Sequence, residues 1–98
     1  MITKVADDTH LLPKGRGGGV LRCEVWVDQR GRGVRYNLAY NNHDLYQGDN
    51  GRVLGYDSRH GYHHRHYCGE VTAVEFESFE ATEERFHAQW YALWTSRK

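Results

Sequence analysis

The order of two kinds of sequence pattern constrains the fold of this chain more than any other feature. Several short segments with strand-like composition come first, separated by turns that contain glycine, and one helical pattern follows them. The clearest strand segment is 34–40, where apolar and polar residues alternate as a half-buried strand requires. Because short turns join antiparallel neighbours, we predict an α+β fold, a small antiparallel β-meander sheet of four to five strands packed by a C-terminal α-helix.

Branched and aromatic residues mark the other strand segments, at 20–27, 52–57 and 71–76. Asn50 and Gly51 indicate a hairpin turn, because these residue types readily take the positive φ angles of a tight turn. We expect this turn to join a strand near Leu45 to segment 52–57.

A chain of 98 residues has room for one domain. Within it we expect an irregular or weakly stranded N-terminal arm at 1–19, the sheet at 20–77 and the C-terminal helix at 78–95. Ser78 is the predicted N-cap, and Arg97 and Lys98 are expected near the helix C-terminus, where the dipole favours positive charge. The apolar stripe that would pack on the sheet is Phe79, Phe86, Trp90 and Leu93.

The formal net charge is zero, from 13 basic and 13 acidic side chains, but the charges are unevenly distributed. Segment 14–35 holds six basic residues and two acidic ones, whereas segment 70–84 holds six acidic residues and no basic one. The basic segment suits a phosphate backbone, although ordinary solvated strand and turn charges explain it at least as well. Since no apolar run suits a transmembrane helix or a secretion signal, we expect a cytoplasmic protein with no membrane partner.

Four of the seven histidines lie between positions 60 and 66, among arginines and tyrosines. Core packing does not produce such a composition, so this segment is the candidate functional site. If it is extended, His64 and His66 share one face, whereas His63, Arg65 and Tyr67 lie on the other.

Three interpretations of the histidine segment compete. Two imidazoles can serve as general acid and base while an arginine stabilises charge on a phosphoryl group, as metal-independent RNA cleavage requires. Alternatively, His64 and His66 ligate a transition metal, or the segment is a solvated polar turn. Arg59 and Arg65 favour the first interpretation, because guanidinium groups repel a metal ion and bind phosphate oxygens.

An ordered series of residues resembles the TumE family of toxins from type II toxin-antitoxin pairs. The series runs from Asn50 through Tyr56 and Asp57 to the triplet His64, Arg65 and His66, and the whole resemblance covers about 34–90. Its other parts are Gly51 to Gly55, His60, Gly61, Glu75, Phe76, Ser78, Phe79, Glu80, Arg85 and Phe86. The resemblance implies a growth-inhibiting protein that a cognate antitoxin protein neutralises by direct contact.

Together, the residues and the resemblance lead to the hypothesis of a toxin that is a metal-independent endoribonuclease inhibiting translation or growth. The candidate catalytic residues are His64, His66, Arg65, His60 and Asp57. The candidate substrate-binding residues are Arg59, Tyr67, Arg30, Arg32 and Arg35. We expect no cofactor or metal, and the antitoxin and RNA as partners; the sequence leaves room for a homodimer. Two alternatives stay open: a noncatalytic module that binds nucleic acid or protein, and a metal-dependent hydrolase with a His-x-His site.

Overall fold

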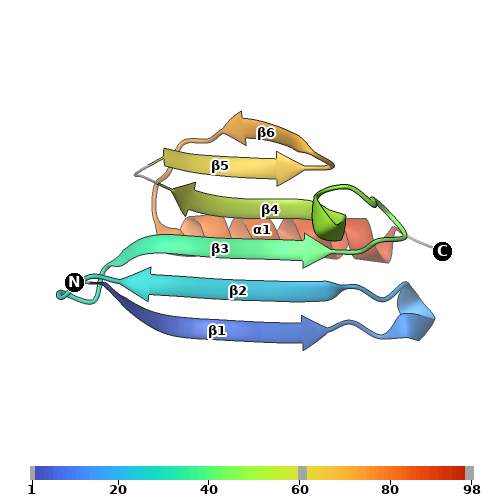
Figure 1. The fold of residues 1–98 in the computed structure, drawn as a ribbon, viewed down its shortest axis with the longest axis horizontal. Coiled ribbons are helices and arrows are strands. Elements are labelled where there is room, and N and C mark those ends of the chain that lie inside the picture. Colours follow the sequence, from blue (N-terminus) through green and yellow to red (C-terminus); the bar gives the residue numbers. More distant parts are fainter. Residues whose placement is uncertain (1, 60–61, 97–98) are drawn as a thin grey trace.

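A computed structural model describes residues 2–59 and 62–96 of the chain (Figure 1). Within these ranges, six strands form one antiparallel sheet in the order of the sequence, and a single α-helix packs against it. The elements are β1 (Thr3–Leu11), η1 (Lys14–Arg16), β2 (Val20–Val27), β3 (Gly33–Asn41), η2 (Asp49–Gly51), β4 (Arg52–Arg59), β5 (Tyr62–Tyr67), β6 (Glu70–Ala73) and α1 (Phe79–Thr95). The predicted meander with a C-terminal helix is confirmed.

The predicted number of strands is wrong, because the sheet has six strands and not four to five. Two strands lie outside the segments predicted to be strands from their composition. One is β5, in the histidine segment. The other is β1, which lies in the arm predicted to be irregular or weakly stranded and pairs with β2 from Thr3 opposite Val27 to Leu11 opposite Val20. β1 is an edge strand, and all of its residues except Ala6 are exposed. An edge strand without a buried face needs no alternation of apolar residues, so periodicity does not reveal it.

The predicted hairpin at Asn50 and Gly51 is also wrong in part. Both residues have the expected positive φ angles, 55° and 79°. However, no strand forms near Leu45 within the described residues, and β3 connects to β4 through the longer loop 42–51. Asn42 organises this loop: its backbone N–H donates to the Gly51 carbonyl at 2.7 Å, and its side-chain oxygen accepts the N–H of Asp44 at 3.0 Å.

α1 begins where the sequence predicts, since the Ser78 hydroxyl accepts a hydrogen bond from the Ala81 N–H at 3.1 Å. Phe86 is 1% exposed in the core between helix and sheet, and the other stripe residues, Phe79, Trp90 and Leu93, pack around it. The sheet contributes Tyr36, Leu38, Tyr40, Val53, Leu54 and Tyr56 to this core. The predicted positions of Arg97 and Lys98 lie outside the described residues. The predicted strand 71–76 ends at Ala73.

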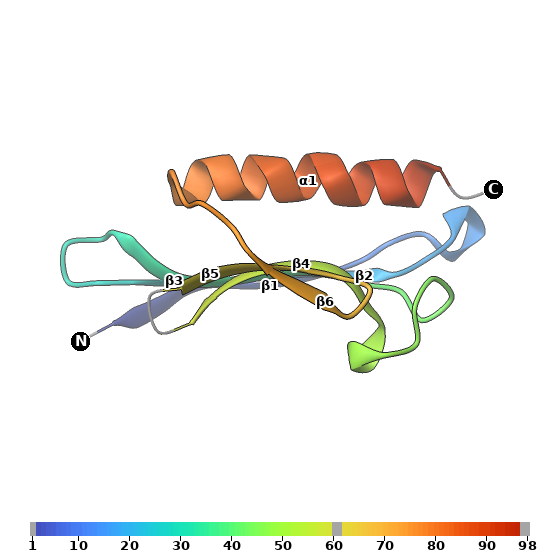
Figure 2. The ribbon, with the colours of Figure 1, turned by 90° about the horizontal axis from the view of Figure 1, so that it is seen from above.

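The two faces of the sheet have different environments (Figure 2). α1 covers one face, toward which β3 directs Tyr36, Leu38 and Tyr40. Alternation along the same strand directs Arg35 and Asn37 to the opposite face, which we call the open face. The loop 42–51 also projects to this side of the sheet, away from α1 (Figure 2). No helix within the described ranges is both long and apolar enough to span a bilayer.

Candidate active site on the open face of the sheet

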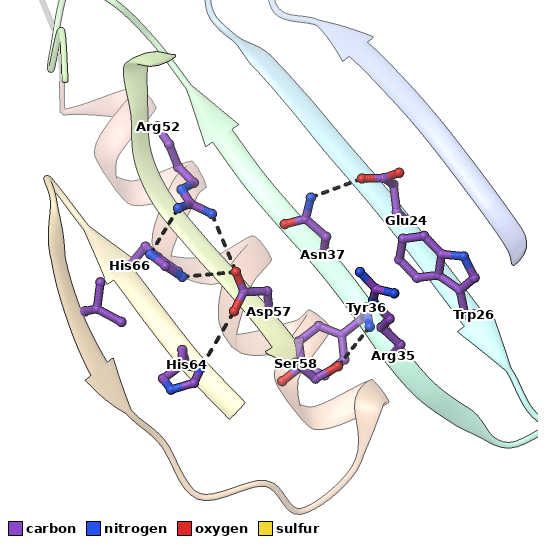
Figure 3. Close-up of a pocket in the computed structure, with 11 residues that line it drawn as sticks. Glu24, Trp26, Arg35, Tyr36, Asn37, Arg52, Asp57, Ser58, His64 and His66 are labelled. Carbon is purple, nitrogen blue, oxygen red and sulfur yellow. Dashed lines mark hydrogen bonds and ion pairs between the residues drawn. The ribbon is translucent and has the colours of Figure 1, made fainter. Parts of the chain in front are cut away.

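A cavity of about 600 Å³ lies on the open face (Figure 3). Side chains from β2 to β6 surround it, and most of them are polar or charged. Its lining residues are Glu24, Trp26, Arg35, Tyr36, Asn37, Arg52, Asp57, Ser58, His64, His66 and Val71. It is therefore built by strands that are distant in sequence, and the histidine segment supplies only part of it.

The register of the sheet explains which side chains meet in this cavity. Glu24 is opposite Asn37, Asn37 is opposite Asp57, and Asp57 is opposite His64. Directly opposite residues of antiparallel strands share a face and have Cβ atoms about 5 Å apart. One row of the sheet therefore places a carboxylate, an amide, a second carboxylate and an imidazole side by side.

The pairing of β3 with β4 ends within this row, at Asn37 and Asp57. Beyond it, the Tyr36 backbone N–H donates to the Ser58 hydroxyl at 3.1 Å rather than to a strand carbonyl. The two strands therefore separate beside the row, and the side chains that line the separation surround the cavity (Figure 3).

Asp57 lies between the two histidines of the predicted triplet. Its Oδ2 atom is 3.0 Å from His66 Nε2, and its Oδ1 atom is 3.9 Å from His64 Nδ1. His66 is the more buried of the two, with 14% of its side chain exposed against 33% for His64. The predicted common face of His64 and His66 is confirmed, and the Asp57 carboxylate lies between the two rings on it.

Arg52 adds a guanidinium to this group. Its Nη2 atom donates to His66 Nδ1 at 3.1 Å, and its Nη1 atom lies 3.6 Å from Asp57 Oδ2. Its Nε atom donates to Asp49 Oδ2 at 2.8 Å, which connects the loop 42–51 to the cavity. Arg52 thus pairs with one carboxylate on each side and also holds an imidazole.

Glu24 is held as a carboxylate at the β2 side of the cavity. A hydrogen bond from Lys4, at 2.7 Å, and a second from the Asn37 amide, at 3.0 Å, lower the pKa of Glu24. Arg22 lies 3.4 Å from the same carboxylate. An ionised carboxylate with these partners is unsuited to donate a proton, so Glu24 is not a candidate general acid.

Arg35 is the exposed cation of the cavity. Its guanidinium carbon lies 4.8 Å from the centre of the Trp26 ring, a cation–π distance. Within the described part of the chain Arg35 makes no ion pair. Its charge is therefore available to an anionic ligand.

His63 has a structural environment on the helix side of the sheet. Its ring stacks on Phe76 with centroids 4.0 Å apart, and its Nδ1 atom is 2.8 Å from the Tyr36 hydroxyl. Burial, with a smaller contribution from His64, lowers the pKa of His63, and burial raises the pKa of Tyr36 to about 12. A neutral phenol and a neutral imidazole therefore share this hydrogen bond, and the two rings pack on the helix side of the sheet.

The structure brings only some of the predicted site residues together. His64, His66, Asp57 and Arg35 line the cavity. Arg65 and Tyr67 lie on the helix side, where the Arg65 guanidinium is 5.1 Å from the Tyr67 ring and its Nε is 3.4 Å from Gln89 Oε1. Arg30 and Arg32 line a separate hollow at the β2–β3 turn. His60 and the side chain of Arg59 lie outside the described residues.

Several cavity residues were not predicted from the sequence. Asn37 lies on the polar face of the alternating segment 34–40, beside Arg35, and that pattern contains the signal to find it. Glu24 is a polar residue between two apolar ones along β2, which is a similar signal. Arg52 falls within the series that resembles the TumE family, but no strand pattern places it in the cavity, because its position depends on an irregularity in the β3–β4 register at Tyr40 and Asn41.

A metal site does not emerge from the described residues: no three histidine, cysteine, aspartate or glutamate side chains among them are grouped to hold an ion. The cavity instead combines imidazole, carboxylate and guanidinium groups, which suit proton transfer beside a bound anion.

Comparison with known proteins identifies the family to which this chain belongs. A family model described as Toxin TumE matches residues 14–92, a range that contains every residue lining the cavity. Neither the curated proteins nor the solved structures gave a match. Because the family match spans most of the chain, from before β2 into the last turns of α1, this chain belongs to the TumE family of toxins.

Proposed function

We propose that the cavity on the open face cleaves RNA without a metal ion, and that this cleavage is how the toxin inhibits translation or growth. The family match supports a toxin of a toxin-antitoxin system. The observation that carries the nuclease proposal is the position of Asp57 between His64 and His66, with the Arg35 guanidinium on the same face.

The proposed reaction is an internal transesterification. A base takes the proton of a ribose 2′-hydroxyl, the 2′-oxygen forms a bond to phosphorus, and the bond from phosphorus to the 5′-oxygen breaks. The 5′-oxygen gains a proton as it leaves. The products are a 2′,3′-cyclic phosphate and a 5′-hydroxyl end, and no metal ion takes part.

His64 is the residue best placed to take the 2′-hydroxyl proton. A third of its side chain is exposed, it lines the cavity, and the nearby Asp57 carboxylate can stabilise the imidazolium that forms. Arg35 is the proposed phosphate ligand, because it is exposed and unpaired among the described residues. In this proposal Arg35 takes the role that the sequence suggested for Arg65, which lies on the other face.

The proposed partners are RNA as substrate and a cognate antitoxin as the neutralising protein. Both would meet the toxin in the cytoplasm, where we propose that it acts. A protein that covers the open face would exclude RNA from the cavity, so direct contact is sufficient for neutralisation.

The first test combines growth and cleavage assays. Expression without the antitoxin should arrest growth, and the purified protein should cleave RNA in the presence of EDTA to leave 2′,3′-cyclic phosphate ends. His64→Gln should abolish both effects. His10→Gln, the same change at an exposed histidine of β1, is the matched control and should abolish neither.

Three outcomes would contradict the proposal. If the folded protein leaves a broad RNA pool intact with and without divalent ions, the nuclease assignment fails. If cleavage occurs only with a divalent ion, the alternative of a metal-dependent hydrolase replaces it. Toxicity that survives His64→Gln but is lost when Arg30, Arg32 and Arg35 are replaced would instead favour a noncatalytic binding module.

A further inference from the structure

We infer that Arg52 fixes the His66 ring as the tautomer with its proton on Nε2, and that His66 is therefore a positioning residue and not the general acid or base. The catalytic part of this inference rests on the proposed function. The tautomer itself is a property of the folded protein and can be tested without any substrate.

The contact at Nδ1 determines where the proton is. Arg52 Nη2 lies 3.1 Å from His66 Nδ1. A guanidinium has only hydrogen-bond donors, and it stays protonated in proteins. His66 Nδ1 must therefore accept this hydrogen bond with its lone pair, and the ring proton must be on Nε2.

The second ring nitrogen of His66, Nε2, faces the Asp57 carboxylate. Nε2 lies 3.0 Å from Asp57 Oδ2, and it is buried without a well-aligned hydrogen bond to any described residue. The contact is therefore electrostatic, and a carboxylate oxygen, which only accepts, still favours an N–H over a lone pair at this position. Nδ1 is then occupied by Arg52 and Nε2 is buried against Asp57, so a substrate could reach neither nitrogen without displacing Arg52 or Asp57.

Arg52 is itself held in place. Its Nε atom donates to Asp49 Oδ2 at 2.8 Å, and only 20% of its side chain is exposed. Its stem crosses over Gly55, where the absence of a side chain leaves the space. The donor to His66 is thus anchored at both ends, by the loop 42–51 and by the carboxylate of Asp57.

The two oxygens of the Asp57 carboxylate face different residues. Oδ2 faces His66 and Arg52, and Oδ1 is left toward His64 Nδ1 at 3.9 Å. His64 is then the one imidazole of the cavity with a nitrogen free for substrate, since its Nε2 has no partner among the described residues. The site works with a single catalytic histidine, and the Asp49, Arg52, His66 and Asp57 side chains form a chain of contacts that orients it.

With His66 excluded from proton transfer, His64 and water move the protons of the reaction. The 2′-hydroxyl proton moves to His64, and a water molecule supplies the proton that the departing 5′-oxygen gains. The hydroxide left by that water takes the proton from His64, so the enzyme returns to its starting state. No proton passes through His66.

Long-range ¹⁵N–¹H NMR of the histidine rings tests the tautomer directly. The His66 signals, identified by their loss in His66→Gln, should show a protonated Nε2 and an unprotonated Nδ1. In Arg52→Gln the ring proton should exchange between Nδ1 and Nε2, so the signals of the two nitrogens should be averaged. Arg35→Gln, a change at the other cavity arginine, should leave the wild-type pattern unaltered. A His66 ring protonated on Nδ1, or already averaged in the wild-type protein, overturns the inference.

Cleavage kinetics test the positioning role. Glutamine at position 66 can accept from Arg52 with its oxygen and donate to Asp57 with its amide, but it cannot transfer protons. His66→Gln should therefore keep kcat within about tenfold of the wild type, whereas His64→Gln should lose at least about a hundredfold, the usual contribution of a general base. Equal losses in the two variants would show that His66 transfers a proton and would overturn the role proposed for it.

The two kinds of measurement separate failure of this inference from failure of the proposed function. If wild-type protein does not cleave RNA at all, the nuclease proposal fails, and the NMR experiment still decides the tautomer. If the wild type cleaves RNA and His64→Gln and His66→Gln lose kcat equally, the nuclease proposal stands and the positioning role of His66 fails. Thermal unfolding of each variant confirms that the compared proteins are folded.

Discussion

The side chain of Arg52 occupies the space above Gly55. A Cβ atom added to Gly55 would lie 2.8 Å from Arg52 Cδ and 3.2 Å from the backbone oxygen of Leu38. Gly55 is opposite His66 in the β4–β5 register, so the missing side chain lets the guanidinium reach the imidazole. A glycine in a buried strand is usually a weakness, but here it makes room for the arginine that connects two carboxylates and a histidine.

Gly55→Ala tests this relationship. The added methyl group must displace Arg52, and its contact with the Leu38 carbonyl involves backbone that cannot move easily. We expect a loss of about 1–3 kcal/mol in the free energy of unfolding, together with weaker RNA cleavage and an averaged His66 tautomer. Urea unfolding and the NMR experiment measure these effects. Gly15→Ala is the matched control, because a Cβ there meets nothing within 4 Å; equal stability of the two variants would contradict the expectation.

Arg35 provides a prediction about salt dependence. If it binds a phosphate of single-stranded RNA, Arg35→Gln should weaken binding for all sequences and reduce the slope of log K against log salt by about 0.7. Fluorescence anisotropy of a labelled RNA at several salt concentrations gives this slope. Arg32→Gln serves as the control, because Arg32 lies in the β2–β3 turn within 3.8 Å of Asp28 and outside the cavity. A larger reduction of this slope in Arg32→Gln than in Arg35→Gln would indicate that RNA binds along the β2–β3 turn and not at the cavity.

His63 should make the stability of the fold depend on mildly acidic pH. Burial, and to a smaller extent His64, lowers the pKa of His63 below its ordinary value of 6.5. The unfolded chain therefore binds this proton at a higher pH than the folded chain does. The stabilising contribution is complete above about pH 6.5 and is lost as the pH falls toward the lower pKa of the folded state.

Thermal unfolding between pH 7.5 and pH 5 measures this dependence. His63→Gln keeps a side chain that can form a hydrogen bond with the Tyr36 hydroxyl but removes the titration, so its unfolding midpoint should fall less steeply over that range. His10→Gln, at an exposed position, should follow the wild type. An unchanged slope in His63→Gln would refute the assignment.

Ser78 offers a prediction about stability alone. Its hydroxyl accepts the Ala81 N–H, one of the donors that the first turn of α1 leaves without a helical partner. Ser78→Ala should lower the free energy of unfolding by about 1 kcal/mol without changing the cavity, which lies on the other face of the sheet. Urea unfolding measures the loss, and Ser78→Asp should recover most of it, because aspartate is an equally good cap. Failure of aspartate to recover stability would argue against the capping role.

Local patterns predicted the features that depend on one element at a time. The alternation along 34–40 correctly separated Tyr36, Leu38 and Tyr40 from the open face, and Ser78 correctly marked the start of α1. The same reasoning placed His64 and His66 together. It failed for β1, whose exposed position at the edge removes the periodic signal, and for the loop 42–51, whose course depends on Asn42 binding Gly51 across its ends.

By itself the sequence determined the meander and its helix, and which face of each strand is polar, because the period of two belongs to the single strand. Only the tertiary structure decided which polar residues are neighbours, because register is a property of strand pairs. It aligned Glu24, Asn37, Asp57 and His64 across four strands and turned Arg65 toward the helix. It also brought Arg52 to His66 through the gap at Gly55, a contact that no local pattern contains.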